Sequence, residues 1–94
     1  MKDEKRKIRD NLIFLSIGGA SICAKKEVSD NTYNEWIHNV ERIVHTCSYE
    51  YNPNIYLNFL KVCMNALPIK SNNDKMRYCL KYLLGVAKLL KEMV

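Results

Sequence analysis

The sequence predicts an all-α protein, a compact bundle of about four helices that forms a single domain over residues 1–94. Apolar residues recur at steps of three and four in four separate segments, and no segment alternates like a strand. Glycine and proline are scarce, with three and two copies, and they fall where helices would bend or end. Hydrophobic residues make up 48% of the chain and charged residues 27%, a balance typical of a folded globule.

The first helix is expected over residues 3–25 because one inward-facing stripe runs along it. That stripe comprises Ile8, Leu12, Leu15, Gly19 and Ile22. Its weak point is the pair Gly18 and Gly19, since a glycine inside a helix costs about 1 kcal/mol relative to alanine. The pair therefore predicts a kink, a split, or a close approach by another part of the chain.

A second helix is expected over residues 30–47, and its start carries capping signals. Thr32 and Glu35 have the spacing of a capping box, while Ser29 or Asp30 would cap the helix one turn earlier. The apolar face is well separated from the polar one. It comprises Tyr33, Trp36, Ile37, Val40, Ile43, Val44 and Cys47. Residues 48–52 are expected to form a loop.

The third and fourth helices are expected over residues 53–66 and 73–94. Pro53 suits the first position of the third helix, and Pro68 ends that helix. Asn72 or Asn73 is the expected cap of the fourth. Beside its core-facing stripe, the fourth helix carries a second apolar stripe, which comprises Tyr82, Val86, Leu89 and Met93. So wide an apolar circumference must be covered on two sides, by the domain itself or by a second chain.

The N-terminal segment has the layout of a secretory signal, because basic residues 5–9 precede an apolar run at residues 12–24. Asp3, Glu4 and Asp10 dilute the basic stretch. The 13-residue run is also shorter than the about 20 residues that cross a bilayer. We therefore expect a retained segment, no membrane span, and a cytoplasmic or host-cell intracellular protein. Abundant Asn, Lys, Ile and Tyr is typical of AT-rich coding sources such as viruses, mobile elements and low-GC bacteria.

The four cysteines invite a zinc or disulfide interpretation, which their spacing does not support. None has a partner at the two-residue to four-residue spacing of structural zinc ligands. In an up-down-up-down bundle, Cys23, Cys63 and Cys79 fall toward one end and Cys47 toward the other. Each lies in an apolar stripe, where a free thiol acts as a small hydrophobe. We expect four reduced cysteines in a reducing compartment, with Cys63 and Cys79 the one pair to check for contact.

No catalytic, metal or cofactor site is expected, and no small-molecule substrate. His38 and His45 are seven residues apart on one helix, about 10 Å, which is too far to share a metal ion. The sequence has no local motif that joins a nucleophile to a base and an orienting carboxylate. It also lacks a glycine-rich phosphate loop. The features that define an active site are thus missing, and we expect a protein that is not an enzyme.

The leading functional hypothesis is a small regulatory or inhibitory module that binds protein. It would act by self-association, as an oligomer, or by capturing a helix of another protein through the second stripe of the fourth helix. The net charge of +5 comes from 15 Lys and Arg against 10 Asp and Glu. That excess favours an acidic partner, either a protein face, a nucleic acid or an anionic membrane surface.

The alternative hypothesis is a basic nucleic-acid-binding protein. Residues 22–37 resemble a helix-turn-helix, with Cys23 at the small position and apolar residues at the anchoring ones. Lys26 and Glu27 depart from that pattern. The resemblance would turn Asn31, Asn34 and His38 toward DNA. A second possible nucleic-acid face is the basic side of the fourth helix, which comprises Arg77, Tyr78, Lys81 and Lys88.

Overall fold

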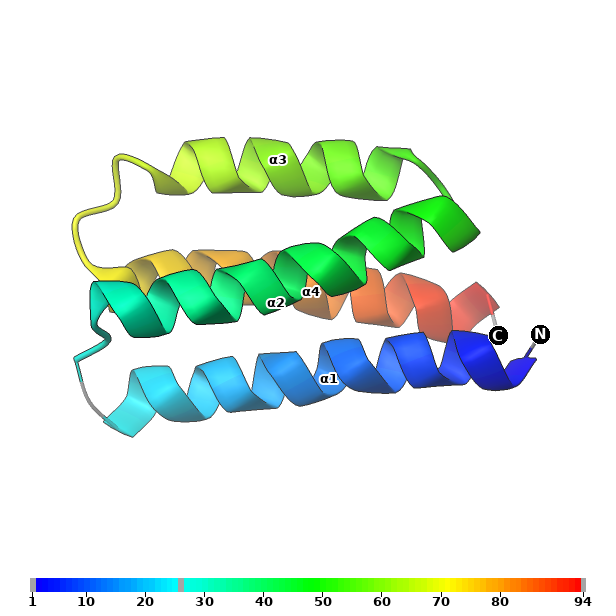
Figure 1. Ribbon diagram of the computed structural model, residues 1–94, viewed down its shortest axis with the longest axis horizontal. Helices are drawn as coiled ribbons and strands as arrows, with labels where there is room; N and C mark the ends of the chain where they lie inside the picture. Colours follow the sequence, from blue (N-terminus) through cyan, green and yellow to red (C-terminus); the bar gives the residue numbers. More distant parts are fainter. Residues whose placement is uncertain (1, 26, 94) are drawn as a thin grey trace.

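Four helices make up the regular structure of the protein. The computed structural model describes the backbone of residues 2–25 and 27–93 and the side chains of residues 6–25 and 27–90. Within that part, all regular secondary structure is helical: α1 (Lys2–Lys25), α2 (Asp30–Glu50), α3 (Asn54–Ala66) and α4 (Asn72–Met93). Successive helices run antiparallel, and α4 returns to lie beside α1, with the two chain ends at the same end of the bundle (Figure 1). The predicted all-α bundle of four helices is confirmed.

One cluster of buried side chains, contributed by all four helices, forms the core. Its fully buried members are Leu12, Val40, Val44, Cys47, Phe59, Met76, Cys79, Leu83 and Leu90. Every one of these residues belongs to a stripe that recurs at helical spacing, so each helix turns its most regular apolar face inward. Burying each large apolar side chain contributes about 1.5–3 kcal/mol, which makes this cluster the main stabilising feature of the fold.

The glycine pair in α1 marks a close approach rather than a split. Figure 1 shows one unbroken helix from Lys2 to Lys25. Gly19 is buried, and a Cβ atom built on it would lie 2.8 Å from Cε2 and Cζ2 of Trp36. The indole thus packs directly on the bare backbone of α1. Its Nε1 donates a hydrogen bond to the carbonyl oxygen of Leu15 at 3.0 Å, which satisfies the buried N–H group.

Several helix ends differ from the sequence prediction, and α3 begins at Asn54, with Pro53 at its N-cap and not at the first helical position. Helix α2 continues to Glu50, through part of the segment expected to be a loop, and the N–H of Tyr51 still donates to the carbonyl of Cys47 at 2.9 Å. Ser71, not Asn72 or Asn73, caps α4: the N–H of Asp74 donates to Ser71 Oγ at 3.3 Å. Both asparagine side chains instead reach the segment that joins α1 to α2.

The start of α2 agrees with one of the two predicted caps. Ser29 has extended backbone angles and its hydroxyl oxygen accepts a hydrogen bond from the N–H of Thr32 at 3.1 Å. Such a cap stabilises a helix by about 1 kcal/mol. Helix α2 therefore begins at Asp30, as expected from the earlier of the two capping signals.

We expect Gly19→Ala to destabilise the protein and Gly18→Ala to stabilise it. The new methyl at residue 19 would overlap the indole of Trp36, and overpacking of this kind costs about 1–3 kcal/mol. A Cβ on Gly18 meets nothing within 4 Å, so that variant should gain about 0.5–1 kcal/mol from the lower flexibility of the unfolded chain. Urea unfolding followed by far-UV circular dichroism measures both. Equal free energies of unfolding for the two variants would contradict the close contact.

Candidate functional site

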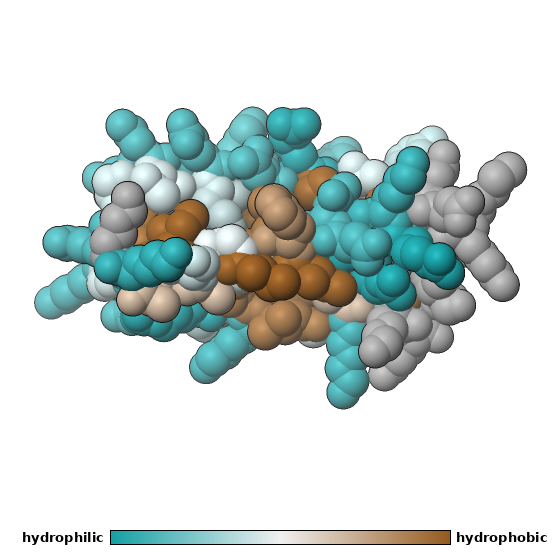
Figure 2. Space-filling model, turned by 90° about the horizontal axis from the view of Figure 1, so that it is seen from below, coloured by the Kyte–Doolittle hydropathy of each residue, from teal (hydrophilic) through white to brown (hydrophobic). Residues whose placement is uncertain are grey.

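The solvent-facing side of the α1 and α4 pair is an apolar groove. It is lined by Ile13, Ser16, Ile17, Ala20, Leu80 and Leu84, and we name these six residues the α1/α4 groove. Ile13, Ile17 and Leu84 remain 39%, 65% and 58% exposed. Figure 2, which views the molecule from the α1 side, shows hydrophobic side chains gathered over the middle of this face, with hydrophilic side chains on either side of them. Because large exposed apolar patches are typical of interaction sites, this groove is the candidate functional site.

The chemistry of the groove suits protein side chains rather than a small molecule. The one polar residue in its lining, Ser16, is buried and donates its hydroxyl hydrogen to the carbonyl oxygen of Leu12 at 2.8 Å. The hollow has a volume of about 180 Å³. Small-molecule pockets usually measure about 300–1,000 Å³ and carry several convergent polar groups. The groove is smaller and offers no such groups, so it fits one or two apolar side chains.

Basic side chains border the groove along α4. Lys81 and Lys88 stand three residues before and four residues after Leu84, so both neighbour it on the helix surface, and Lys81 also lines the hollow between α4 and α3. Both lysines are exposed, and neither forms an ion pair with a side chain that the structure describes. Arg77, one turn further back, forms an ion pair with Asp74 at 2.9 Å. Among the described side chains of α4, the unpaired charges next to Leu84 are therefore these two lysines.

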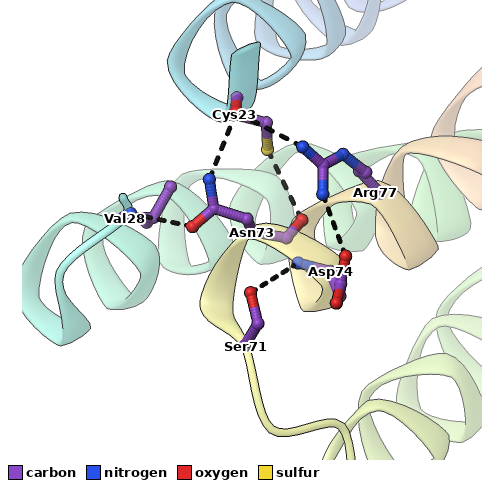
Figure 3. Close-up of polar contacts among 6 residues, drawn as sticks. All are labelled: Cys23, Val28, Ser71, Asn73, Asp74 and Arg77. Atoms are coloured by element: carbon purple, nitrogen blue, oxygen red, sulfur yellow. Dashed lines mark hydrogen bonds and ion pairs between the residues drawn. The ribbon is translucent and has the colours of Figure 1, made fainter. Parts of the chain in front are cut away.

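A network of hydrogen bonds holds α1 against α4 and so keeps the groove in shape (Figure 3). Asn73 Nδ2 donates to the carbonyl oxygen of Cys23 at 3.2 Å, and the N–H of Val28 donates to Asn73 Oδ1 at 2.9 Å. Arg77 Nη2 donates to the same Cys23 carbonyl at 3.4 Å. One amide thus satisfies the end of α1 and the segment after it, where helix carbonyls otherwise lack partners.

The second apolar stripe of α4 is covered in part by the domain itself, which is one of the two alternatives that the sequence left open. Val86 is buried, and Tyr82 is partly buried, with its hydroxyl donating to the carbonyl oxygen of Ile55. Helix α3 packs on this side of α4, which leaves Leu89 exposed and covers the other two. The side chain of Met93 lies outside the described residues. Tyr82 and Val86 are thus covered within the part of the chain that the structure describes, and protein binding through Tyr82, Val86, Leu89 and Met93 stays a prediction.

The residues that line the groove on α1 were missed at the level of sequence, although a signal was present. The run at residues 12–24 is apolar around most of the helix rather than along one stripe. One side of this run faces the core, and Ile13 and Ile17 lie on the outer side of the helix. An apolar run that is too short to span a membrane and too wide for one core contact therefore indicates an outer docking face.

The residues proposed for nucleic-acid binding fall on two separate surfaces. Asn31, Asn34 and His38 are exposed on α2. Helices α1 and α2 lie side by side and antiparallel (Figure 1), whereas the helices of a helix-turn-helix cross at about 90–120°. On α4, Tyr78 is 37% exposed, and the cations lie beside the α1/α4 groove. The segment 22–37 thus has the geometry of an α-hairpin, and nucleic-acid binding stays a prediction.

All four cysteines are free thiols, and burial makes them weakly acidic. Burial raises the pKa of Cys47 to about 12 and that of Cys79 to about 11. It also raises the pKa of Cys23 and of Cys63. Thiolates, not thiols, act as nucleophiles and metal ligands. Among the described side chains, no group of three His, Cys, Asp or Glu is placed to hold a metal ion.

Comparison with known proteins gives no match, whether with protein-family models, with curated proteins or with solved structures. Of the helices in residues 2–25 and 27–93, none combines the length and apolar character that crossing a membrane requires. The surface geometry of the chain itself is therefore the basis for a functional proposal.

We expect Asn73→Ala to weaken the contact between the end of α1 and the start of α4. Val28 is 3% exposed, so its N–H would lose its acceptor inside the protein, at a cost of about 1–3 kcal/mol. Hydrogen exchange at the Val28 amide should accelerate, and the free energy of unfolding should fall. Asn65→Ala, on the exposed side of α3, is the matched control and should change stability by less than about 0.5 kcal/mol. An unchanged exchange rate of the Val28 amide hydrogen in the Asn73 variant would show that the Asn73 side chain does not stabilise this contact.

Proposed function

We propose that the chain is a non-enzymatic protein-binding module that captures an amphipathic helix of a partner protein in the α1/α4 groove. The single observation that supports this proposal is the groove: Ile13, Ile17 and Leu84 stay exposed although the core beneath them is closed. Capture would regulate or inhibit the partner by occupying one of its helices, with no chemical step.

The spacing of the lining residues favours a helix as the occupant. Ile13, Ile17 and Ala20 follow each other at steps of four and three along α1, and Leu80 and Leu84 are four apart on α4. The groove therefore runs along the helix axes for about 10 Å, or two turns. A third helix laid in it presents apolar residues at the same steps, and the small Ala20 lets its backbone come close.

The basic border favours an acidic partner helix. Lys81 and Lys88 flank Leu84, so glutamate or aspartate residues beside the apolar stripe of a partner would meet them. A second copy of this chain would instead bring the same two lysines to the contact, where they would repel. Exposed ion pairs contribute only about 0–1 kcal/mol each. Apolar burial, at about 25 cal/mol per Å², therefore supplies the affinity, and the lysines select among partners.

The proposal predicts a preference between two synthetic helices that differ only in charge. Both peptides carry leucines at heptad spacing, and their other positions are glutamate in one and lysine in the other. Fluorescence anisotropy of the labelled peptides should show tighter binding of the glutamate peptide than of the lysine peptide. Ile17→Asp should weaken that binding by about tenfold or more, because it places a carboxylate in the groove. Leu57→Asp on α3, where the parent side chain is 54% exposed against 65% for Ile17, should leave the binding unchanged.

A double charge reversal separates the role of the border from that of the groove. With Lys81→Glu and Lys88→Glu together, the preference should turn toward the lysine peptide, because the border then attracts the opposite charge. A parent protein that binds neither peptide would refute helix capture. Binding of duplex DNA or RNA by a parent that ignores both peptides would favour the nucleic-acid alternative.

A further inference from the structure

A hollow between α1 and α2 lies apart from the α1/α4 groove. Figure 1 shows these two helices side by side. The hollow has a volume of about 230 Å³, and its lining shares no residue with the groove. We name its lining residues the α1/α2 hollow: Asn11, Phe14, Leu15, Asn39, Arg42 and Ile43. It is a second candidate binding site on the surface of the bundle.

The lining of the α1/α2 hollow combines apolar and polar side chains. Leu15 and Ile43 are partly buried and pack against the core, and Phe14 adds an aromatic ring that is 75% exposed. The polar part consists of exposed side chains: Asn11, Asn39 and Arg42. Within the part of the chain that the structure describes, these three side chains form no hydrogen bond or ion pair. Their hydrogen-bond donors are therefore available to a ligand beside an apolar surface.

Arg42 supplies the charge of the hollow, because a guanidinium carries only donors and stays protonated. Two acidic residues within one turn of the lining do not neutralise it. Asp10 is ion-paired with Arg9 at 3.3 Å. Burial and, after it, the carboxylate of Glu41 raise the pKa of the Cys63 thiol on α3, so Glu41 lies on the α3 side of α2.

Two further charges stand one turn outside the lining. Glu35 precedes Asn39 by four residues on α2, and Lys7 precedes Asn11 by four residues on α1. Since the two helices run antiparallel, Glu35 and Lys7 stand at opposite ends of the hollow (Figure 1). Their charges are of opposite sign, so the balance at the hollow itself stays positive and favours an anionic ligand.

We propose that the α1/α2 hollow binds the C-terminal residue of a peptide or protein chain, with the terminal carboxylate at Arg42 and an apolar side chain against Leu15 and Ile43. A C-terminal residue carries both groups on one carbon atom, as the mixed lining requires. An internal aspartate or glutamate offers the carboxylate without the apolar group. The amides of Asn11 and Asn39 both donate and accept, so they suit the terminal carboxylate and the last peptide N–H.

The size of the hollow favours a chain end over a free small molecule. At about 230 Å³ it falls below the usual range of small-molecule pockets, which enclose most of the ligand. Its polar side chains and Phe14 are exposed, so a ligand would be covered on one side alone. One residue fills such a hollow while the rest of its chain extends over the surface. The site does not depend on helix capture in the α1/α4 groove.

Three synthetic peptides test the proposal by nuclear magnetic resonance of the full chain. The first ends in leucine with a free carboxylate, the second has the same sequence with a C-terminal amide, and the third ends in glycine with a free carboxylate. The first should shift the side-chain amide signals of Asn11 and Asn39 and saturate at millimolar concentration or below. The other two should bind about tenfold more weakly or less, because each lacks one of the two groups.

Two charge-matched variants locate the binding of the first peptide. Arg42→Gln removes the guanidinium and should weaken that binding by about tenfold, to the level of the amidated peptide. Lys61→Gln removes one exposed positive charge from α3 and should leave the dissociation constant unchanged. Far-UV circular dichroism confirms that both variants fold.

Four results would overturn the proposal. The first is equal affinity for the acid and amidated peptides, and the second is an equal loss of affinity in the two glutamine variants. The third is the absence of shifts at Asn11 and Asn39 at millimolar peptide. The fourth is binding of free 4-methylpentanoate as tightly as the first peptide, which would assign the hollow to small organic acids. Capture of the glutamate helix is measured separately, so either proposal can fail without the other.

Discussion

The arrangement of the whole protein depends on how closely α1 approaches its two neighbours. On the side of α2, the missing side chain of Gly19 admits the indole of Trp36, whose N–H bonds to the backbone of α1. On the side of α4, the amide of Asn73 bonds to the end of α1 and to the segment that follows it. These contacts use backbone groups and the inward stripe. The outer residues of α1 are consequently not needed to hold the helix in place, and they stay apolar and exposed.

The apolar faces that the core leaves uncovered are the candidate surfaces for a partner. A chain of 94 residues builds one core, and here the core uses one face of each helix. Apolar residues remain on the outer side of α1 and α4 and on the outer side of α3. Lysines border the first surface, and Lys61 lies within the second beside the amides of α3. If a partner helix binds in the α1/α4 groove, apolar burial would supply most of the binding free energy, and the bordering lysines would favour an acidic partner.

Much of the fold follows from periodicity alone, because burial of one apolar stripe per helix dominates the energetics. The four helices and most core residues, such as Leu12 and Val40, were predictable for this reason. The cap of α4 was not predictable from the sequence, since the Asn73 side chain bonds to the end of α1 and only the tertiary structure reveals this contact. The burial of Val86 was not predictable either, because a sequence gives the width of an apolar face but not the neighbour that packs on it. The groove requires two distant helices to be adjacent, and the sequence does not indicate their rotation.

Nuclear magnetic resonance can show whether a partner helix docks between α1 and α4. Isotope-labelled protein is titrated with the glutamate-flanked helical peptide, and the backbone amide shifts are followed residue by residue. The largest shifts should occur at residues 13–20 of α1 and 80–84 of α4, with the amides of residues 57–67 unchanged. Shifts that centre on α3 or on the outer side of α2, or no shifts at saturating peptide, would contradict this docking.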